Sequence, residues 1–143
     1  MPHDAARAVP GTFPMPAWWR DHAFTLREIA EFLGAPKATV DHWFDIARAA
    51  GIGVGQKKGG RRFYSAHEVF AACLLGKLRE HSIPVSNTTI SSAFAFACHP
   101  DGKPRTIADN AMWRLYGENG AAVEVEAWLC WSAARAYAAQ HFD

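Results

Sequence analysis

Apolar residues recur at i, i+3, i+4 and i+7 in two neighbouring stretches of the chain, which is the spacing of one buried helix face. The two stripes are Leu26, Ile29, Ala30 and Leu33, and Val40, Trp43, Phe44 and Ala47. Thr25 and Glu28 have the spacing of a capping box before the first stripe. Gly34 ends that stripe shortly before Pro36, a residue tolerated at the start of a helix. The pattern predicts a helix of about two turns, a tight turn and a second helix over residues 37–48, which together form a helix-turn-helix unit.

A basic hairpin is predicted over residues 52–64. Apolar positions in this segment are isolated, and a Gly-Gly pair at 59–60 fits a hairpin turn. Between Asp45 and Glu68 there are five basic residues and no acidic one. The basic residues are Arg48, Lys57, Lys58, Arg61 and Arg62. Because the formal net charge of the whole chain is only +1, the positive charge is concentrated here, and we expect it to contact phosphates.

The remainder of the chain predicts three more helices and a second hairpin. A capping box at Ser65 and Glu68 opens a helix over residues 66–80, and another helix follows the turn at 83–86 and runs through Ala97. The sequence HPDGKPRT is a loop by composition. MWRLY and AAVEVEA flank a GENG turn and predict the second hairpin, and the last helix is predicted over residues 127–142.

Composition and cysteine usage argue against several classes of protein. At 143 residues, half of them hydrophobic, the chain is long enough for one folded domain with a true core. Cys73, Cys98 and Cys130 are far apart and include no CxxC pair, so we expect neither a disulfide framework nor a zinc site, and a reducing cytoplasm. The first residues contain no apolar leader, and no stretch of about 18 apolar residues predicts a membrane span.

No catalytic motif is recognisable in the sequence. The seven histidines occur without an HExxH motif or a partnered nucleophile, and no glycine-rich phosphate loop follows a strand. Cys98 and His99 are adjacent, which is not metal-ligand spacing, and the apolar run around Cys73 predicts an inert core thiol. We therefore expect no enzyme, no cofactor and no metal site. Trp18 and Trp19 are expected to pack on the domain that follows them.

Four segments resemble the MerR-type winged-helix DNA-binding domains and their relatives among excisionases and phage terminase small subunits. They are FTLREIAEFLG as first helix and turn, KATVDHWF as recognition helix, GGRRFYS as the end of the wing, and HEVFAACLLGKLREHSIPVS as the helix pair after it. The resemblance covers about residues 23–97, and GGRRFYS is its most specific element. It implies a mainly α fold, a winged helix-turn-helix with a small two-stranded wing and a C-terminal extension that is helical or a hairpin plus a helix.

The expected domain layout follows from this resemblance and from composition. Residues 1–17 are rich in proline and lack periodicity, so we expect a flexible arm there. Residues 18–98 form the expected DNA-binding domain, and residues 99–143 an extension for dimerisation or partner binding.

The resemblance also implies which residues contact DNA. In that family a wing arginine and tyrosine contact the DNA backbone, which implies this role for Arg62 and Tyr64, with Arg61 adjacent. The start of the recognition helix enters the major groove, which implicates Thr39 and His42. The full candidate set for DNA binding is Lys37, Thr39, Asp41, His42, Lys57, Lys58, Arg61, Arg62 and Tyr64.

Two details of this set differ from a simple basic surface. Asp41 stands where the family usually places an arginine, and its carboxylate would accept from a cytosine amine or orient a neighbouring cation. Of the two aromatic residues that end the hairpin, we expect the ring of Phe63 to face the core and the hydroxyl of Tyr64 to stay free for a phosphate. The chain lacks the long dimerisation helix and the cysteine cluster of MerR metal sensors, so the resemblance implies no metal effector.

The last predicted helix has two interpretations. Its apolar stripe comprises Ala127, Trp131, Ala134, Ala138 and Phe142, widened by Trp128, Leu129 and Tyr137. Such a helix must be buried, either in the core of its own chain or against a second subunit. We expect a homodimer, because winged-helix regulators read paired half-sites.

The function expected from the sequence is sequence-specific binding of double-stranded DNA, with the helix over 37–48 in the major groove and the basic hairpin on the backbone. The main interpretation is a transcriptional regulator of the cytoplasm, associated with the nucleoid, whose C-terminal segment dimerises or meets RNA polymerase or another protein. An alternative is a phage-type DNA-packaging or recombination factor. A weaker alternative is a protein-interaction module without DNA binding, in which the two helices are packed core helices with a solvated outer face.

Overall fold

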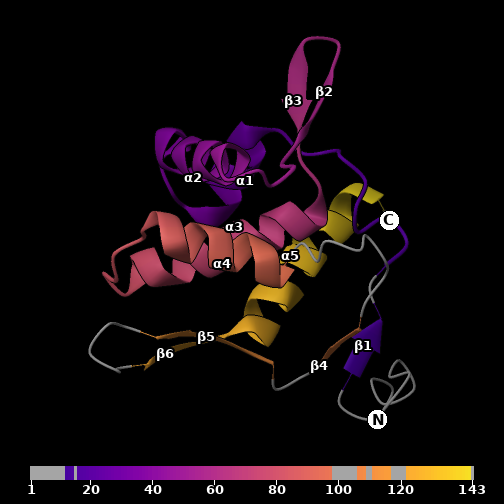
Figure 1. Ribbon diagram of the computed structural model, residues 1–143. Helices are drawn as coiled ribbons and strands as arrows, with labels where there is room; N and C mark the ends of the chain where they lie inside the picture. Colours follow the sequence, from indigo (N-terminus) through magenta and orange to yellow (C-terminus); the bar gives the residue numbers. More distant parts are fainter. Residues whose placement is uncertain (1–11, 15, 98–105, 109–110, 117–121, 143) are drawn as a thin grey trace.

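Five helices carry most of the described chain, and three pairs of short strands are attached to them (Figure 1). The computed structural model describes residues 12–14, 16–97, 106–108, 111–116 and 122–142. The helices are α1 (Leu26–Leu33), α2 (Lys37–Ala49), α3 (Ala66–Glu80), α4 (Asn87–Ala97) and α5 (Ala127–Phe142). None of these five is long and apolar enough to cross a bilayer. The fold is mainly helical, as the sequence predicts.

Each strand pair is antiparallel and has only two strands. The pairs are β1 (Thr12–Pro14) with β4 (Thr106–Ala108), β2 (Gln56–Lys58) with β3 (Arg61–Phe63), and β5 (Met112–Tyr116) with β6 (Ala122–Glu126). The last two pairs confirm the basic hairpin and the second hairpin that the sequence predicts. In the second hairpin, Trp113 lies opposite Val125 on the buried face, and Arg114 pairs with Glu124 on the exposed face at 3.2 Å.

The β1–β4 pair includes three residues of the segment 1–17, for which the sequence predicts a flexible arm. Phe13 lies opposite Ile107, so residues near the start of the chain are tied to a strand far along it. β1 and β4 have three residues each, too few to show the alternation of apolar and polar residues that predicts a strand. The sequence pattern therefore could not predict this pairing. Residues 1–11, most of the HPDGKPRT loop and the Cys98–His99 pair lie outside the described residues, and the expectations about them stay predictions.

The ends of α1 and α2 follow the local sequence signals. The backbone N–H of Thr25 donates to Glu28 Oε1 at 2.9 Å, and the N–H of Glu28 donates to Thr25 Oγ1 at 3.2 Å, which is the predicted capping box. Gly34 follows the last turn of α1, and α2 begins after Pro36. The predicted second helix, residues 37–48, is one residue shorter than α2.

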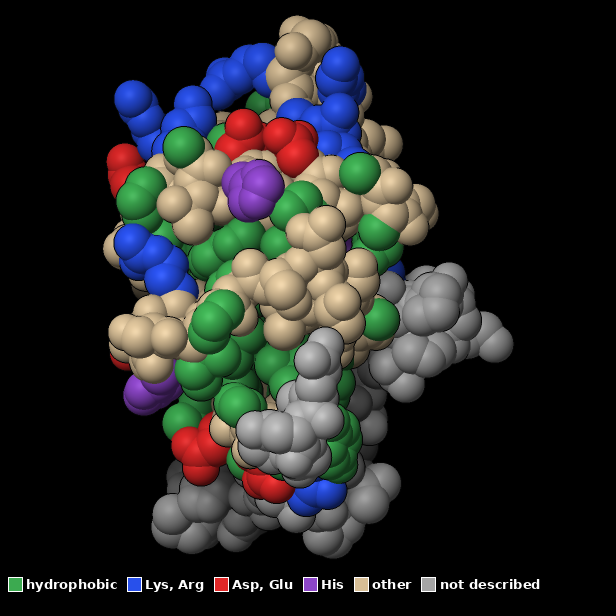
Figure 2. Space-filling model, turned by 60° about the vertical axis from the view of Figure 1, so that its left-hand side comes forward, with side chains coloured by type: hydrophobic (Ala, Val, Ile, Leu, Met, Phe, Trp, Pro, Cys, Tyr) green, Lys and Arg blue, Asp and Glu red, His purple; other side chains and the backbone are tan. Residues whose placement is uncertain are grey.

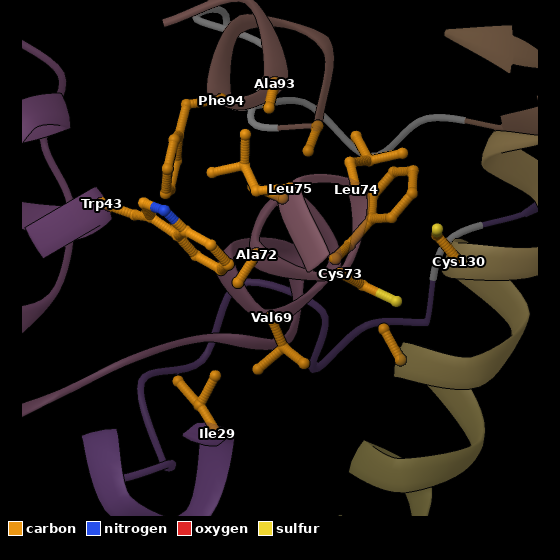
Figure 3. Close-up of a cluster of buried hydrophobic side chains, with 14 of the residues drawn as sticks. Ile29, Trp43, Val69, Ala72, Cys73, Leu74, Leu75, Ala93, Phe94 and Cys130 are labelled. Atoms are coloured by element: carbon orange, nitrogen blue, oxygen red, sulfur yellow. The ribbon is translucent and has the colours of Figure 1, made fainter. Parts of the chain in front are cut away.

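Helix α3 is the centre of the core. Every side chain from Ala66 to Leu75 is buried, so this helix has no solvated face over most of its length. The other helices surround it (Figure 1), and Figure 3 shows Trp43 of α2 and Phe94 of α4 pointing toward the α3 residues Ala72 and Leu75. The helix-turn-helix unit is thus fixed to the rest of the chain through α3.

Helix α5 packs on α3 within its own chain. Its stripe is buried there except for the half-buried Phe142, and the ring centroid of Trp131 lies 5.8 Å from that of Trp19. Trp18 stacks on Phe142 at 4.8 Å, so the prediction that the two tryptophans pack on the domain is confirmed. The Tyr137 hydroxyl donates to the carbonyl of Glu28 in α1 at 3.3 Å. The expectation that this stripe faces a second subunit is therefore wrong, because it completes the core of one chain.

Two cysteines lie in that contact between α3 and α5. Cys73 and Cys130 are both buried and free of disulfides, and Figure 3 shows their side chains on facing helices. The hydrogen bond with Cys73, together with burial, raises the pKa of the Cys130 thiol, which keeps it protonated. The prediction that Cys73 is a core thiol is confirmed.

The packing of α5 is tested by removing its largest buried side chain. Trp131→Ala should lower the free energy of unfolding by about 3–5 kcal/mol, because it leaves a cavity between α5 and α3. Leu129→Ala on the same helix is the matched control. Since Leu129 is 52% exposed, its truncation should change stability by less than about 0.5 kcal/mol. Urea denaturation measures both, and equal stability of wild type and Trp131→Ala would contradict the packing described here.

Candidate nucleic-acid interface

The basic hairpin stands away from the helices at one end of the molecule (Figure 1). Gly59 and Gly60 form its two-residue turn with φ values of 58° and 81°, which favour glycine at both positions. Lys57 lies directly opposite Arg62, and Lys58 directly opposite Arg61. Both cross-strand pairs therefore carry like charges, which destabilise a ribbon of two strands. A polyanion bound across the hairpin would remove this repulsion.

The hairpin is tied to the segment before α1. Tyr64 forms an antiparallel bridge with Phe24, in which each backbone N–H donates to the other residue's carbonyl at 2.7 and 2.9 Å. At the other strand, Lys58 Nζ donates to the carbonyl oxygen of His22 at 2.7 Å. The hairpin is thus held beside α1 and α2.

Tyr64 does not present a free hydroxyl, and this expectation is wrong. Its side chain is 2% exposed and stacks on Phe44 at 4.4 Å, and its hydroxyl accepts from Arg48 Nη1 at 3.3 Å. Phe63 is instead the half-buried residue, with Lys58 and Arg61 over its ring at 5.9 and 5.6 Å. The reason is the bridge to Phe24, which draws the Tyr64 backbone into the body of the protein.

A groove of about 460 Å³ lies between the hairpin and the starts of α1 and α2. We call it the basic groove, and it is lined by Thr25, Leu26, Arg27, Lys37, Asp41, Arg48, Arg61, Arg62 and Tyr64. Five of these nine residues are cationic, and Asp41 is the single acid among them. The groove therefore brings together Lys37, Asp41, Arg61, Arg62 and Tyr64 of the predicted set.

Two arginines of the basic groove are absent from the predicted set. Arg27 is exposed in the first turn of α1, off its apolar stripe. Arg48 is two turns beyond Asp41 on the same face of α2, and that i, i+7 spacing is the signal that could have identified it. Arg48 Nη2 donates to Asp45 Oδ1 at 2.5 Å, and although burial opposes it, the bonds to Asp45 and Tyr64 raise the pKa of the Arg48 guanidinium. Arg48 therefore stays charged in the lining of the groove.

The remaining predicted residues lie around the groove. Lys57 and Lys58 are exposed near the tip of the hairpin, and His42 is exposed on the outer face of α2, with Thr39 half-buried one turn earlier. Figure 2 shows that Lys and Arg side chains gather at the end of the molecule that carries the hairpin. At the opposite end the described acidic residues Glu80 and Glu124 are in ion pairs with Lys77 and Arg114. The described cations without an ion pair thus include those of the hairpin strands.

Comparison with protein-family models found no match for this chain, and comparisons with curated proteins and with solved structures found no similar protein.

A buried histidine lies just beyond the hairpin, in the first turn of α3. His67 is 6% exposed, its ring nitrogen Nδ1 is hydrogen-bonded to the Ser65 hydroxyl, and its backbone N–H donates to the carbonyl of Trp19 at 3.2 Å. Burial, followed by the charges of Arg20 and His22, lowers the pKa of His67 from 6.5 to about 3. The folded protein therefore keeps this ring neutral.

This lowered pKa predicts a loss of stability in acid. The unfolded chain takes up a proton on His67 below about pH 6.5, whereas the folded chain does so only near pH 3, so stability should fall as the pH drops between these values. The largest slope this one group gives is about 1.4 kcal/mol per pH unit. His67→Gln should flatten the curve measured by urea denaturation from pH 7 to 4. If the variant and wild type lose stability in parallel, the ring is not held neutral by the fold.

Proposed function

We propose that this chain is a winged helix-turn-helix protein that binds double-stranded DNA in a sequence-specific way and regulates transcription. In this proposal α1 and α2 are the helix-turn-helix pair, α2 enters the major groove, and the basic hairpin is the wing on the phosphate backbone. The proposal rests on the arrangement of charge, and the resemblance to MerR-type domains supports the same assignment.

The like-charge register of the hairpin is the single observation that carries the proposal. Lys57 with Arg62 and Lys58 with Arg61 place four cations on two facing three-residue strands. Without a ligand this arrangement costs stability, because like charges directly opposite in a strand pair repel each other. Phosphates spaced along a duplex backbone would neutralise these cations and release condensed counterions. A hairpin built for structure alone gains nothing from this register.

The basic groove extends the same charge toward α2. Lys37 and Arg48 are on the side of α2 that lines the groove, whereas His42 is on its exposed face. A DNA backbone that follows the basic groove would contact Lys37 and Arg48, while the exposed face of α2 contacts base edges in the major groove. Asp41 also lines the groove. In this proposal its carboxylate, which would repel phosphate, orients the neighbouring cations of the groove.

Two partner expectations stay predictions. The α5 stripe gives the expected homodimer no support, since it packs on α3 of the same chain, and any dimer on paired half-sites must use another surface. Contact of the C-terminal segment with RNA polymerase or another protein is likewise untested by the packing of α5.

Substitution of the hairpin arginines tests backbone contact. In the Arg61→Ala, Arg62→Ala double variant, the slope of log affinity against log salt should become shallower by about 0.9 for each phosphate that the hairpin no longer neutralises. Affinity for a random duplex should fall as much as affinity for the preferred one. Titration of labelled duplex at several salt concentrations measures this, with circular dichroism to confirm that the variant is folded.

The matched control removes two exposed arginines elsewhere, Arg79 in α3 and Arg135 in α5. Arg79→Ala, Arg135→Ala changes the net charge by the same amount but should leave the salt slope at its wild-type value. An unchanged slope in the hairpin variant, or an equal change in both, would exclude specific contact by the hairpin.

Sequence choice is tested on the outer face of α2. Thr39→Ala and His42→Ala should alter the consensus obtained by selection from random duplexes, because each base-edge contact discriminates by about 1–3 kcal/mol. Their affinity for random DNA should change little, because phosphate contacts dominate non-specific binding. The same consensus from wild type and both variants would contradict the placement of α2 in the major groove of DNA.

A further inference from the structure

One carboxylate closes the base of the basic hairpin. The β2–β3 ladder consists of three residue pairs and stops at Gln56 opposite Phe63. The next pair would join Gly55 to Tyr64, but Tyr64 bonds to Phe24 instead. At this gap Glu68 Oε2 accepts from the backbone N–H of Gly55 at 2.7 Å, and Glu68 Oε1 accepts from the N–H of Ser65 at 2.9 Å. A side chain of α3 therefore joins the residue that enters the hairpin to the residue that leaves it.

The carboxylate is fully enclosed. Glu68 has 0% exposure and belongs to the most buried helix of the chain. Of its two bonds from backbone N–H groups, the one from Ser65 is half of the α3 capping box and is explained by helix capping alone. The bond from Gly55 has no such local explanation, because it reaches back across the whole hairpin. Burying a charged group is costly unless it is hydrogen-bonded, so both bonds matter to the fold.

Gly55 is shaped for this contact. Its φ is +77°, and a Cβ at this position would lie 2.8 Å from Arg62 Cγ and Cδ and 2.9 Å from the Tyr64 ring. Only glycine fits between these side chains with its N–H aimed at Glu68. The close approach also brings Arg62 Nη1 to the carbonyl of Val54 at 3.3 Å. The backbone of Gly55 and the guanidinium of Arg62 are thus placed by the same contact.

His22 links the same carboxylate to the tip side of the hairpin. Its Nε2 lies 3.7 Å from Glu68 Oε1, and its carbonyl oxygen accepts from Lys58 Nζ. The base and one strand of the hairpin are therefore attached to residues of a single cluster. A ribbon of two short strands is marginally stable by itself, so these attachments decide its direction.

We propose that Glu68 is a positioning residue that sets the direction of the basic hairpin relative to α2, through its bond to Gly55. This inference rests on the proposed function, because the direction of the hairpin matters to the protein only if its cations must meet a backbone beside α2. Glu68 is buried and negatively charged, so it does not bind phosphate itself. In this proposal it orients the hairpin whose cations do.

Glu68→Gln tests the assignment with little change in shape. A glutamine has one carbonyl oxygen in place of two, so one of the two N–H groups loses its acceptor and faces an amide NH₂. Glu68→Asp is the second variant, because it keeps the charge but is one methylene shorter and cannot span both partners. Glu80→Gln is the matched control, since it makes the same change at an exposed carboxylate of the same helix, which pairs with Lys77 at 3.3 Å and not with the hairpin.

Amide hydrogen exchange followed by NMR separates a local effect from a global one. In Glu68→Gln or Glu68→Asp, the amides of Gly55 and of the β2–β3 ladder should exchange about tenfold faster, the loss expected for a bond to a charged acceptor. The amide of Leu75, buried in α3, should keep its wild-type rate, as should all of these amides in Glu80→Gln. Unchanged exchange at the hairpin, or equal acceleration at Leu75, in both variants would overturn the proposal.

DNA titration of the same variants distinguishes this proposal from the proposed function. Faster hairpin exchange together with a shallower salt slope supports both. Faster exchange with a wild-type salt slope overturns the positioning role, because the hairpin then meets the backbone whatever its direction. If the wild-type protein binds no duplex while the exchange result holds, the DNA-binding function fails and the structural link from Glu68 to the hairpin stands.

Discussion

The burial of α3 on all sides is the constraint on which the rest of the structure depends. The segment of α3 from Ala66 to Leu75 is buried on every side and so cannot lie on a surface, which means that other elements must enclose it. Here α1, α4 and α5 all pack against it, and the chain before α1 contributes Trp19, whose ring lies 6.4 Å from that of Phe70 in α3. The elements of the candidate interface are attached to this framework at their inner sides only. Their outer sides are left to carry charge.

The hairpin carries exposed cations on its strands and is buried at its base. Its cations face one another across the strands, which no core could tolerate, yet its base ends on Tyr64 and Glu68, both buried. The transition from an exposed cationic ribbon to a fully enclosed anchor takes place within three or four residues. Exposure can change over so few residues because successive side chains of a strand point to opposite faces.

The local parts of the fold could be predicted from the sequence, and the parts set by distant contacts could not. Helices α1, α2, α3 and α5 were predictable because capping signals and an apolar period act within a few residues of each other. The β1–β4 pair, the position of Tyr64 and the packing of α5 each depend on a partner far along the chain. In the interface, Arg61 and Arg62 were predictable from local charge and from resemblance, whereas Arg27 enters the groove only because α1 packs beside α2. The exposed residues of α2 were predictable from the apolar period, and their role in reading DNA stays a prediction.

The order of elements along the chain has a consequence for how the protein is made. Helix α5 is synthesised after α3, yet α3 needs it as a cover, and Tyr137 reaches back from α5 to the carbonyl of Glu28 in the helix-turn-helix unit. Until residues near 142 have emerged from the ribosome, α3 exposes the face that Trp131 later covers, and α1 lacks its last neighbour. The nascent chain therefore contains all the residues of the basic groove before α5 covers the core. At this stage the exposed apolar surface can bind chaperones or aggregate. Folding of the interface is therefore coupled to synthesis of α5, and not to synthesis of the segment that contains the interface.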